Sequence, residues 1–167
     1  LGVDMIGGAA FSLSTNGVLA YRAGEDLNRR LLWIDRSGKE TPALDEAREY
    51  WDTGLSPDGT RLAFDIDEGT DKGDVWIRDF SRGVTTRFTF APEPEYAPTW
   101  SPDGRRIVFS RDRKGDGTGS DLFVKDAMGK GEAEPLTDTP GFKYATDWSA
   151  NGDYVIFLHE GKDTDGD

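Results

Sequence analysis

The chain has 167 residues, no cysteine, and 32 acidic against 20 basic residues, which gives a formal net charge of −12. A polyanion of this kind repels nucleic-acid phosphates and anionic membrane surfaces, so the charge argues against both as partners. The lack of cysteine excludes disulfides, thiol catalysis and cysteine-ligated zinc, and no apolar run is long enough to insert into a membrane or to form a signal peptide.

A short motif that ends on glycine recurs along the chain. It reads LSPDG at residues 55–59, WSPDG at 100–104 and WSANG at 148–152, with a degenerate copy, LSTNG, at 13–17. The glycines are 42, 45 and 48 residues apart. This period brackets the roughly 40–45 residues of a four-stranded propeller blade. The sequence therefore predicts stacked blades.

Each repeat carries the same strands in the same order. A strand containing tyrosine (Tyr50, Tyr96 or Tyr144) precedes the motif, an apolar strand follows it, a third strand ends on aspartate, and a short strand closes the repeat. Four such strands form an antiparallel meander. In chain order, we expect the apolar strands at residues 18–21, 62–64, 107–109 and 155–157, the third strands at 32–35, 76–79 and 123–126, and the short strands at Leu44, Phe88 and Leu136.

The repeats predict one all-β domain over residues 1–160 and an acidic tail at 161–167. We expect blades at about residues 8–47, 48–91 and 92–140, with residues 142–160 supplying half of a fourth. No segment has the sustained apolar spacing of a helix. Three and a half blades cannot close a ring of four to eight full blades. We therefore expect a partial propeller whose open blade edges pair with another copy of the chain.

The chemistry of the motif predicts a hairpin turn inside each blade. Proline sets φ at the first turn position, aspartate or asparagine bonds back to the backbone, and glycine adopts positive φ. The serine hydroxyl is expected to satisfy a turn amide, which makes these residues structural. The turn residues are Ser56, Pro57, Asp58, Gly59, Ser101, Pro102, Asp103, Gly104, Ser149, Asn151 and Gly152.

Tryptophans recur at matching places in the repeats. Trp33, Trp76, Trp100 and Trp148 are expected to pack blade against blade. Trp51 follows the tyrosine column by one residue, and it is the aromatic residue that we would most readily place at an exposed binding rim.

These motifs resemble the TolB-type propeller repeat, a relative of the WD repeat with Trp-Ser-Pro-Asp-Gly as its signature. The match runs from about Phe11 to His159 and is most specific in residues 50–157. Residues 16–21, 32–39 and 86–90 also resemble the propeller region of bacterial receptor-like serine/threonine kinases. That resemblance alone implies a sensory module in the periplasm or outside the cytoplasm. The chain contains no kinase motif.

Acidic loops are the candidates for metal binding. Asp65, Asp67 and Asp71 lie between two strands of the second repeat, together with Glu68 and Asp74, and Asp163, Asp165 and Asp167 alternate at the end of the chain. Alternating oxygen ligands are how calcium loops begin, but neither set has the full ligand spacing. We therefore expect solvated acidic loops without a cofactor, and keep Ca²⁺ as the alternative.

No residue pattern predicts catalysis. His159 is the only histidine, and no nucleophile elbow or distinguished pair of carboxylates accompanies it. The glycine-rich loop at residues 115–119 lies between strands, whereas a nucleotide-binding loop requires a following helix. We therefore expect a non-enzymatic module that binds a protein or peptide. The alternatives are an accessory propeller of a hydrolase such as a prolyl-oligopeptidase-like peptidase, the sensory part of a receptor kinase, and a purely structural stretch.

Overall fold

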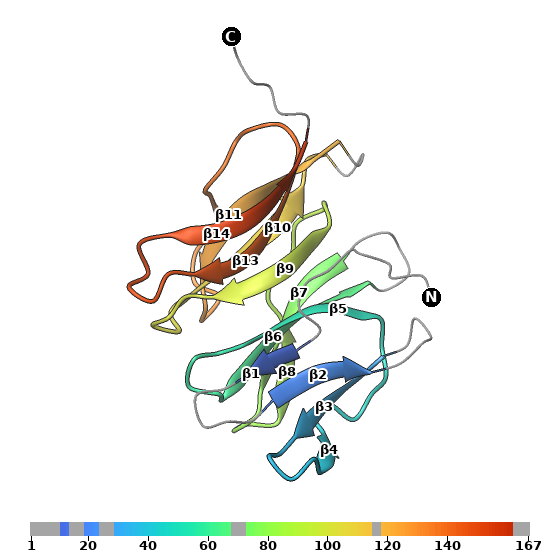
Figure 1. The fold of residues 1–167 in the computed structure, drawn as a ribbon. Helices are drawn as coiled ribbons and strands as arrows, with labels where there is room; N and C mark the ends of the chain where they lie inside the picture. Colours follow the sequence, from blue (N-terminus) through green and yellow to red (C-terminus); the bar gives the residue numbers. More distant parts are fainter. Residues whose placement is uncertain (1–10, 14–18, 24–28, 68–72, 115–117, 162–167) are drawn as a thin grey trace.

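The computed structural model describes residues 11–13, 19–23, 29–67, 73–114 and 118–161 (Figure 1). Regular structure in these ranges consists of antiparallel β-strands. None of the described segments forms a helix that is long and apolar enough to cross a membrane.

The strands form three four-stranded sheets and one two-stranded sheet, which we call the first, second and third blade and the half-blade. Within each sheet the strands lie side by side in chain order. The predicted fold class, with three complete blades and half of a fourth, is confirmed, and the sheets do not close on one another. The first blade contains β1 (Phe11–Leu13), β2 (Leu19–Ala23), β3 (Arg30–Ile34) and β4 (Glu40–Pro42). The second contains β5 (Tyr50–Leu55), β6 (Arg61–Asp67), β7 (Gly73–Asp79) and β8 (Val84–Arg87). The third contains β9 (Glu95–Trp100), β10 (Arg106–Asp112), β11 (Ser120–Asp126) and β12 (Glu134–Pro135), and the half-blade contains β13 (Phe142–Trp148) and β14 (Val155–Glu160).

The core lies at the junctions between blades rather than inside any one sheet. The first strand of each blade contacts the first strand of the next, and the blades follow one another in chain order (Figure 1). A hydrophobic cluster fills each junction. Its most buried members are Leu31, Leu62 and Phe64 at the first junction, Val75, Ile107 and Phe109 at the second, and Val108 and Leu122 at the third.

The motif residues form tight turns between the first two strands of a blade. In the third blade the Ser101 hydroxyl donates to Asp103 Oδ1 at 2.6 Å and accepts from the Arg106 amide at 2.9 Å. The Gly104 amide donates to the Ser101 carbonyl at 2.8 Å, and Gly104 has a φ of 66°. The turns of Ser56 and Ser149 repeat these bonds. The serine hydroxyls are therefore engaged in the hairpins.

Tryptophan joins the second and third blades at the inner strands. The indole Nε1 of Trp100 donates to the Gly54 carbonyl at 2.8 Å, and the Arg61 guanidinium lies 4.5 Å from the ring. A Cβ on Gly54 would lie 2.8 Å from the Pro98 carbonyl oxygen, so glycine permits this close approach. At the next junction, Trp148 makes the equivalent bond to Thr99.

Among the described strands, β14 pairs with β13 alone and so forms an open edge. The β9–β10 and β13–β14 registers make Ile156 and Phe157 the counterparts of Val108 and Phe109 in the third blade. Val108 and Phe109 are both 0% exposed, whereas Ile156 and Phe157 are 64% and 37% exposed. The half-blade therefore presents apolar side chains that a complete blade buries.

Candidate functional site

A groove of about 590 Å³ lies between the second and third blades. One wall comes from β7, β8 and the segment after β8, and the other from the end of β11 and its following turn. The turn between β5 and β6 contributes Asp58 and Thr60, and the start of β6 contributes Arg61. The groove is thus assembled from three segments that only the stacking of blades brings together.

Alternation along β8 supplies the apolar wall. Val84 and Thr86 of β8, with Phe88 and Phe90 just after it, line the groove at alternate positions, and Arg87 lines it as well. Phe88 is buried in the junction, whereas Phe90 is 68% exposed. Met128, on the opposite wall, is 72% exposed. The groove therefore offers apolar side chains to a ligand without disturbing the core.

The groove is locally basic on an acidic chain. Arg61, Arg82, Arg87 and Lys125 line it, against two carboxylates, Asp58 and Asp79. Arg87 forms an ion pair with Asp74 at 2.6 Å outside the groove lining. Within the part of the chain that the structure describes, Arg61, Arg82 and Lys125 have no carboxylate within 4.0 Å.

The ammonium group of Lys125 lies near the aromatic rings of Phe88 and Phe90. Its Nζ donates to the Phe88 carbonyl at 3.1 Å and lies 5.1 Å from the Phe88 ring centre and 5.9 Å from that of Phe90. Cation–π contacts of this length orient an ammonium group without neutralising its charge. Lys125 therefore presents a fixed positive charge beside exposed apolar surface.

A second groove, of about 280 Å³, lies on the other face of the second blade. Its lining includes Asp45 and Glu46 with Arg48 and Arg78, so the charges balance. Trp76 also lines it, and the indole Nε1 is buried without a hydrogen-bond partner. The two grooves thus occupy opposite faces of the second blade but differ in charge.

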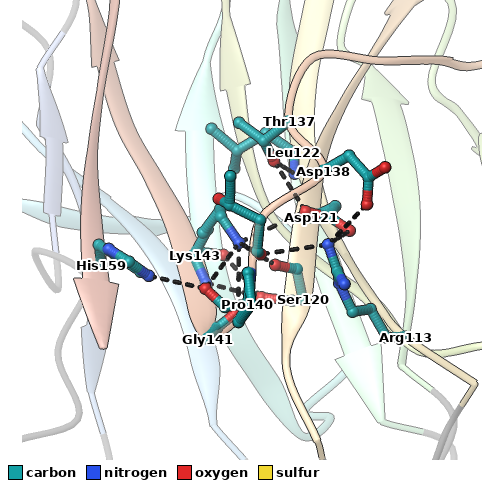
Figure 2. Close-up of polar contacts among 11 residues, drawn as sticks. Arg113, Ser120, Asp121, Leu122, Thr137, Asp138, Pro140, Gly141, Lys143 and His159 are labelled. Atoms are coloured by element: carbon teal, nitrogen blue, oxygen red, sulfur yellow. Dashed lines mark hydrogen bonds and ion pairs between the residues drawn. The ribbon is translucent and has the colours of Figure 1, made fainter. Parts of the chain in front are cut away.

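A buried polar network joins the third blade to the half-blade (Figure 2). The Lys143 ammonium donates to the carbonyls of Ser120 at 3.0 Å, Gly141 at 3.2 Å and Thr139. It also lies 3.4 Å from Asp121 Oδ1, and only 1% of its side chain is exposed. The ammonium is thus enclosed by oxygen atoms of the protein itself.

Asp121 is the anionic centre of that network. Arg113 Nη2 lies 2.7 Å from its Oδ2, and the Thr137 hydroxyl donates to its Oδ1 at 3.0 Å (Figure 2). The ring Nε2 of His159 lies 2.9 Å from the Pro140 carbonyl oxygen, and no turn serine is bonded to it. These side chains hold the loop before β13 in place. We therefore assign the network a structural role.

Only some of the acidic candidates lie in the described part of the chain. Asp65 lies in β6 and is 3% exposed, and its Oδ1 accepts the Asp52 amide at 2.9 Å. Burial, followed by the nearby Asp52 charge, raises the pKa of Asp65 well above its usual range. Asp67 ends β6, while Asp71 and the tail aspartates fall outside the described residues. The described ranges contain no group of three side chains able to hold a metal ion.

Trp51, expected at an exposed rim, is 39% exposed, and the Arg29 guanidinium lies 4.7 Å from its ring. It does not line the basic groove. Sequence reasoning missed the groove. The available signal was the alternation from Val84 to Phe90 in a repeat that also carries Arg82 and Arg87.

Comparison with known proteins shows which proteins this chain resembles. No family model matches the chain. YuxL of Bacillus subtilis, described as an uncharacterized peptidase, is 33% identical over 122 residues, which is 68% of this chain and 18% of YuxL. An uncharacterized protein of Agrobacterium fabrum is 30% identical over 109 residues, or 65% of this chain and 35% of that protein. The chain thus spans only a minor part of the length of either relative.

Solved structures agree on the architecture. TolB from Acinetobacter baumannii superposes with a TM-score of 0.76 at 19% identity, covering 93% of this chain and 38% of TolB. The β-propeller domain of the Trilobed protease from Pyrococcus furiosus, described as having an open velcro topology, gives a TM-score of 0.60 at 13% identity, covering 96% of this chain and 52% of that domain. The chain is therefore built of β-propeller blades. They have the TolB-type fold, which peptidase-associated propellers share.

Proposed function

We propose that the chain is a non-enzymatic propeller module that binds a protein or peptide segment in the groove between its second and third blades. The observation that carries this proposal is the proximity of two exposed apolar side chains, Phe90 and Met128, to unpaired cations. Among the described residues, Arg61, Arg82 and Lys125 have no carboxylate within 4.0 Å, whereas Arg87 pairs with Asp74. Exposed apolar surface beside polar groups is typical of protein-binding sites.

Selection of peptides from a random library tests the proposal. Enriched peptides should bind the unmodified chain and lose most of their affinity for the double variant Phe90→Ser, Met128→Ser. The melting temperature should not change, because both side chains are largely exposed. Tyr154→Ser, which removes another exposed apolar side chain on the half-blade, is the matched control. Enriched peptides that bind the double variant as well as the unmodified chain would refute the groove as the site.

One observation favours a second candidate, an accessory propeller of a peptidase-like hydrolase. YuxL, which carries a peptidase name, is 33% identical to 68% of this chain. In that setting the chain would still act by binding, and catalysis would belong to another domain. Peptides that bind the groove and are also cleaved by a longer parent protein would support this candidate.

We also propose that the open edge of β14 mediates self-association. Tyr154, Ile156 and Leu158 are each more than half exposed, and β14 lacks the third strand that covers its counterpart β10. An unpaired apolar edge is a template for another strand. A two-fold arrangement, in which each half-blade covers the other, is the simplest outcome.

A further inference from the structure

We infer that the segment bound in the groove is an acidic extended peptide that adds a fifth strand to β8, with both acidic and apolar residues among the side chains on its groove face. This inference rests on the proposed function, because it assigns a partner chemistry to the same groove. The chain's own charge is −12, yet four cations gather here against two carboxylates. An acidic ligand therefore finds complementary charge at this groove, which most of the surface does not offer.

Strand addition also requires a free backbone edge, and β8 supplies one. β8 is hydrogen-bonded to β7 alone among the described strands, and all four of its residues are exposed. The Phe88 amide, directly after β8, donates to the Val75 carbonyl at 2.8 Å, so this amide faces β7. Because successive amides of an antiparallel strand point alternately toward the partner strand and away from it, the amides and carbonyls of Thr85 and Arg87 face the open edge. An extended peptide can bond to these groups by strand addition.

The side chains of an added strand would alternate as those of β8 do. Positions on the groove side would meet Phe90 and Met128 together with Lys125, whose Nζ is already fixed over the aromatic wall. Among the side chains on that face, an apolar residue would cover Phe90 and Met128, and an acidic residue two positions away would reach Lys125 or Arg82. A groove-facing set of side chains that contains both acidic and apolar residues therefore suits the backbone edge and the groove together.

An alternative explanation of Arg82 and Arg87 is that their charges prevent other chains from pairing with the edge strand β8, and so prevent aggregation. That role requires charge on the edge but not a groove with apolar walls. It also does not distinguish acidic from basic ligands of the same length. Charge reversal in the ligand therefore separates the two interpretations.

Fluorescence anisotropy with labelled peptides tests the inference. The first probe is an eight-residue peptide in which leucine and glutamate take turns at every second position with threonine between them (Leu-Thr-Glu-Thr-Leu-Thr-Glu-Thr), the second carries lysine in place of glutamate, and the third is the first with its backbone amides methylated. The glutamate peptide should bind at least about tenfold more tightly than the lysine peptide, and the difference should shrink at high salt. Methylation should abolish binding, because it removes the donors of strand pairing.

Variants of the chain test which residues are responsible for binding of the glutamate peptide. Arg82→Glu and Lys125→Gln should each weaken binding of the glutamate peptide by about tenfold. Lys39→Glu, an exposed charge reversal on the first blade, should not. Equal binding of the glutamate and lysine peptides would overturn the acidic partner, and retained binding of the methylated peptide would overturn strand addition. Either result leaves the proposed function standing if library peptides still require Phe90 and Met128, whereas loss of that requirement refutes both.

Discussion

The buried carboxyl of Asp65 is an ionisable group that the fold perturbs. It lies in β6 beside Asp52 and accepts the Asp52 amide. Burial and the neighbouring charge raise its pKa, which means that the folded state favours the protonated form. The side chain was a metal candidate from sequence. Its surroundings are instead those of a carboxyl group that resists ionisation.

Asp65→Asn should stabilise the chain at neutral pH, because the amide has no proton to lose in either state. Well below the ordinary aspartate pKa of about 3.9 the carboxyl is protonated in both states, so it contributes nothing to the pH dependence of stability there. As the pH rises from there through the raised folded pKa, the unfolded state loses its proton first and the unmodified chain loses stability. The asparagine variant lacks this loss.

Thermal unfolding from pH 4 to 8 measures the effect. The difference in melting temperature between Asp65→Asn and the unmodified chain should widen as the pH rises. Asp45→Asn, in an exposed loop, should show no comparable trend. A difference that is constant or narrows with pH would show that Asp65 ionises normally in the folded chain.

The structural role of some residues can be predicted from the sequence, whereas that of others cannot. Ser101, Asp103 and Gly104 could be assigned to a turn because their bonds are local. The burial of Lys143 could not be predicted, because lysine is usually exposed and its oxygen partners come from β11 and the preceding loop. Lys143 and Glu95 both precede the recurring tyrosine, and both are almost fully buried. Aligning the repeats therefore identifies the position of Lys143, but it does not identify the groups that bind its side chain.

At the scale of elements, the order of the strands could be predicted from the sequence repeat, but the surfaces between the blades could not. Period-two alternation places Val84, Thr86 and Phe88 on one face of β8. It does not say whether that face closes completely on the next blade. The turn after β11 also supplies groove-lining residues, Met128 and Gly129, and this contact cannot be predicted from the strand pattern.

The exposed edge of β14 leads to a prediction about assembly. The unmodified chain should show concentration-dependent association in sedimentation equilibrium at micromolar concentration, because pairing of two β14 edges would bury Ile156 and Leu158. Ile156→Lys should shift the equilibrium toward monomer, since it places a charge on the pairing edge. Glu132→Lys, an exposed charge change in the third blade, is the control. A stable monomer of the unmodified chain would contradict this assignment of β14.

At the scale of the whole molecule, stacked blades provide several junctions of similar construction and different chemistry. The junction of the second and third blades carries a basic, apolar groove, the first carries a smaller groove of balanced charge, and the third is held by Lys143 and Asp121. A repeated fold can thus confine recognition to one junction while the others hold the array together.

The most direct test of this account is amide hydrogen exchange with and without a saturating groove-binding peptide. Binding by strand addition should slow exchange in residues 84–90 and in the turn at 126–129, because the peptide pairs with β8 and covers the facing wall. Exchange in β13 and β14 should be unchanged. Protection centred on the inner strands β5, β9 and β13, with none in β8, would contradict the groove between the second and third blades as the binding surface.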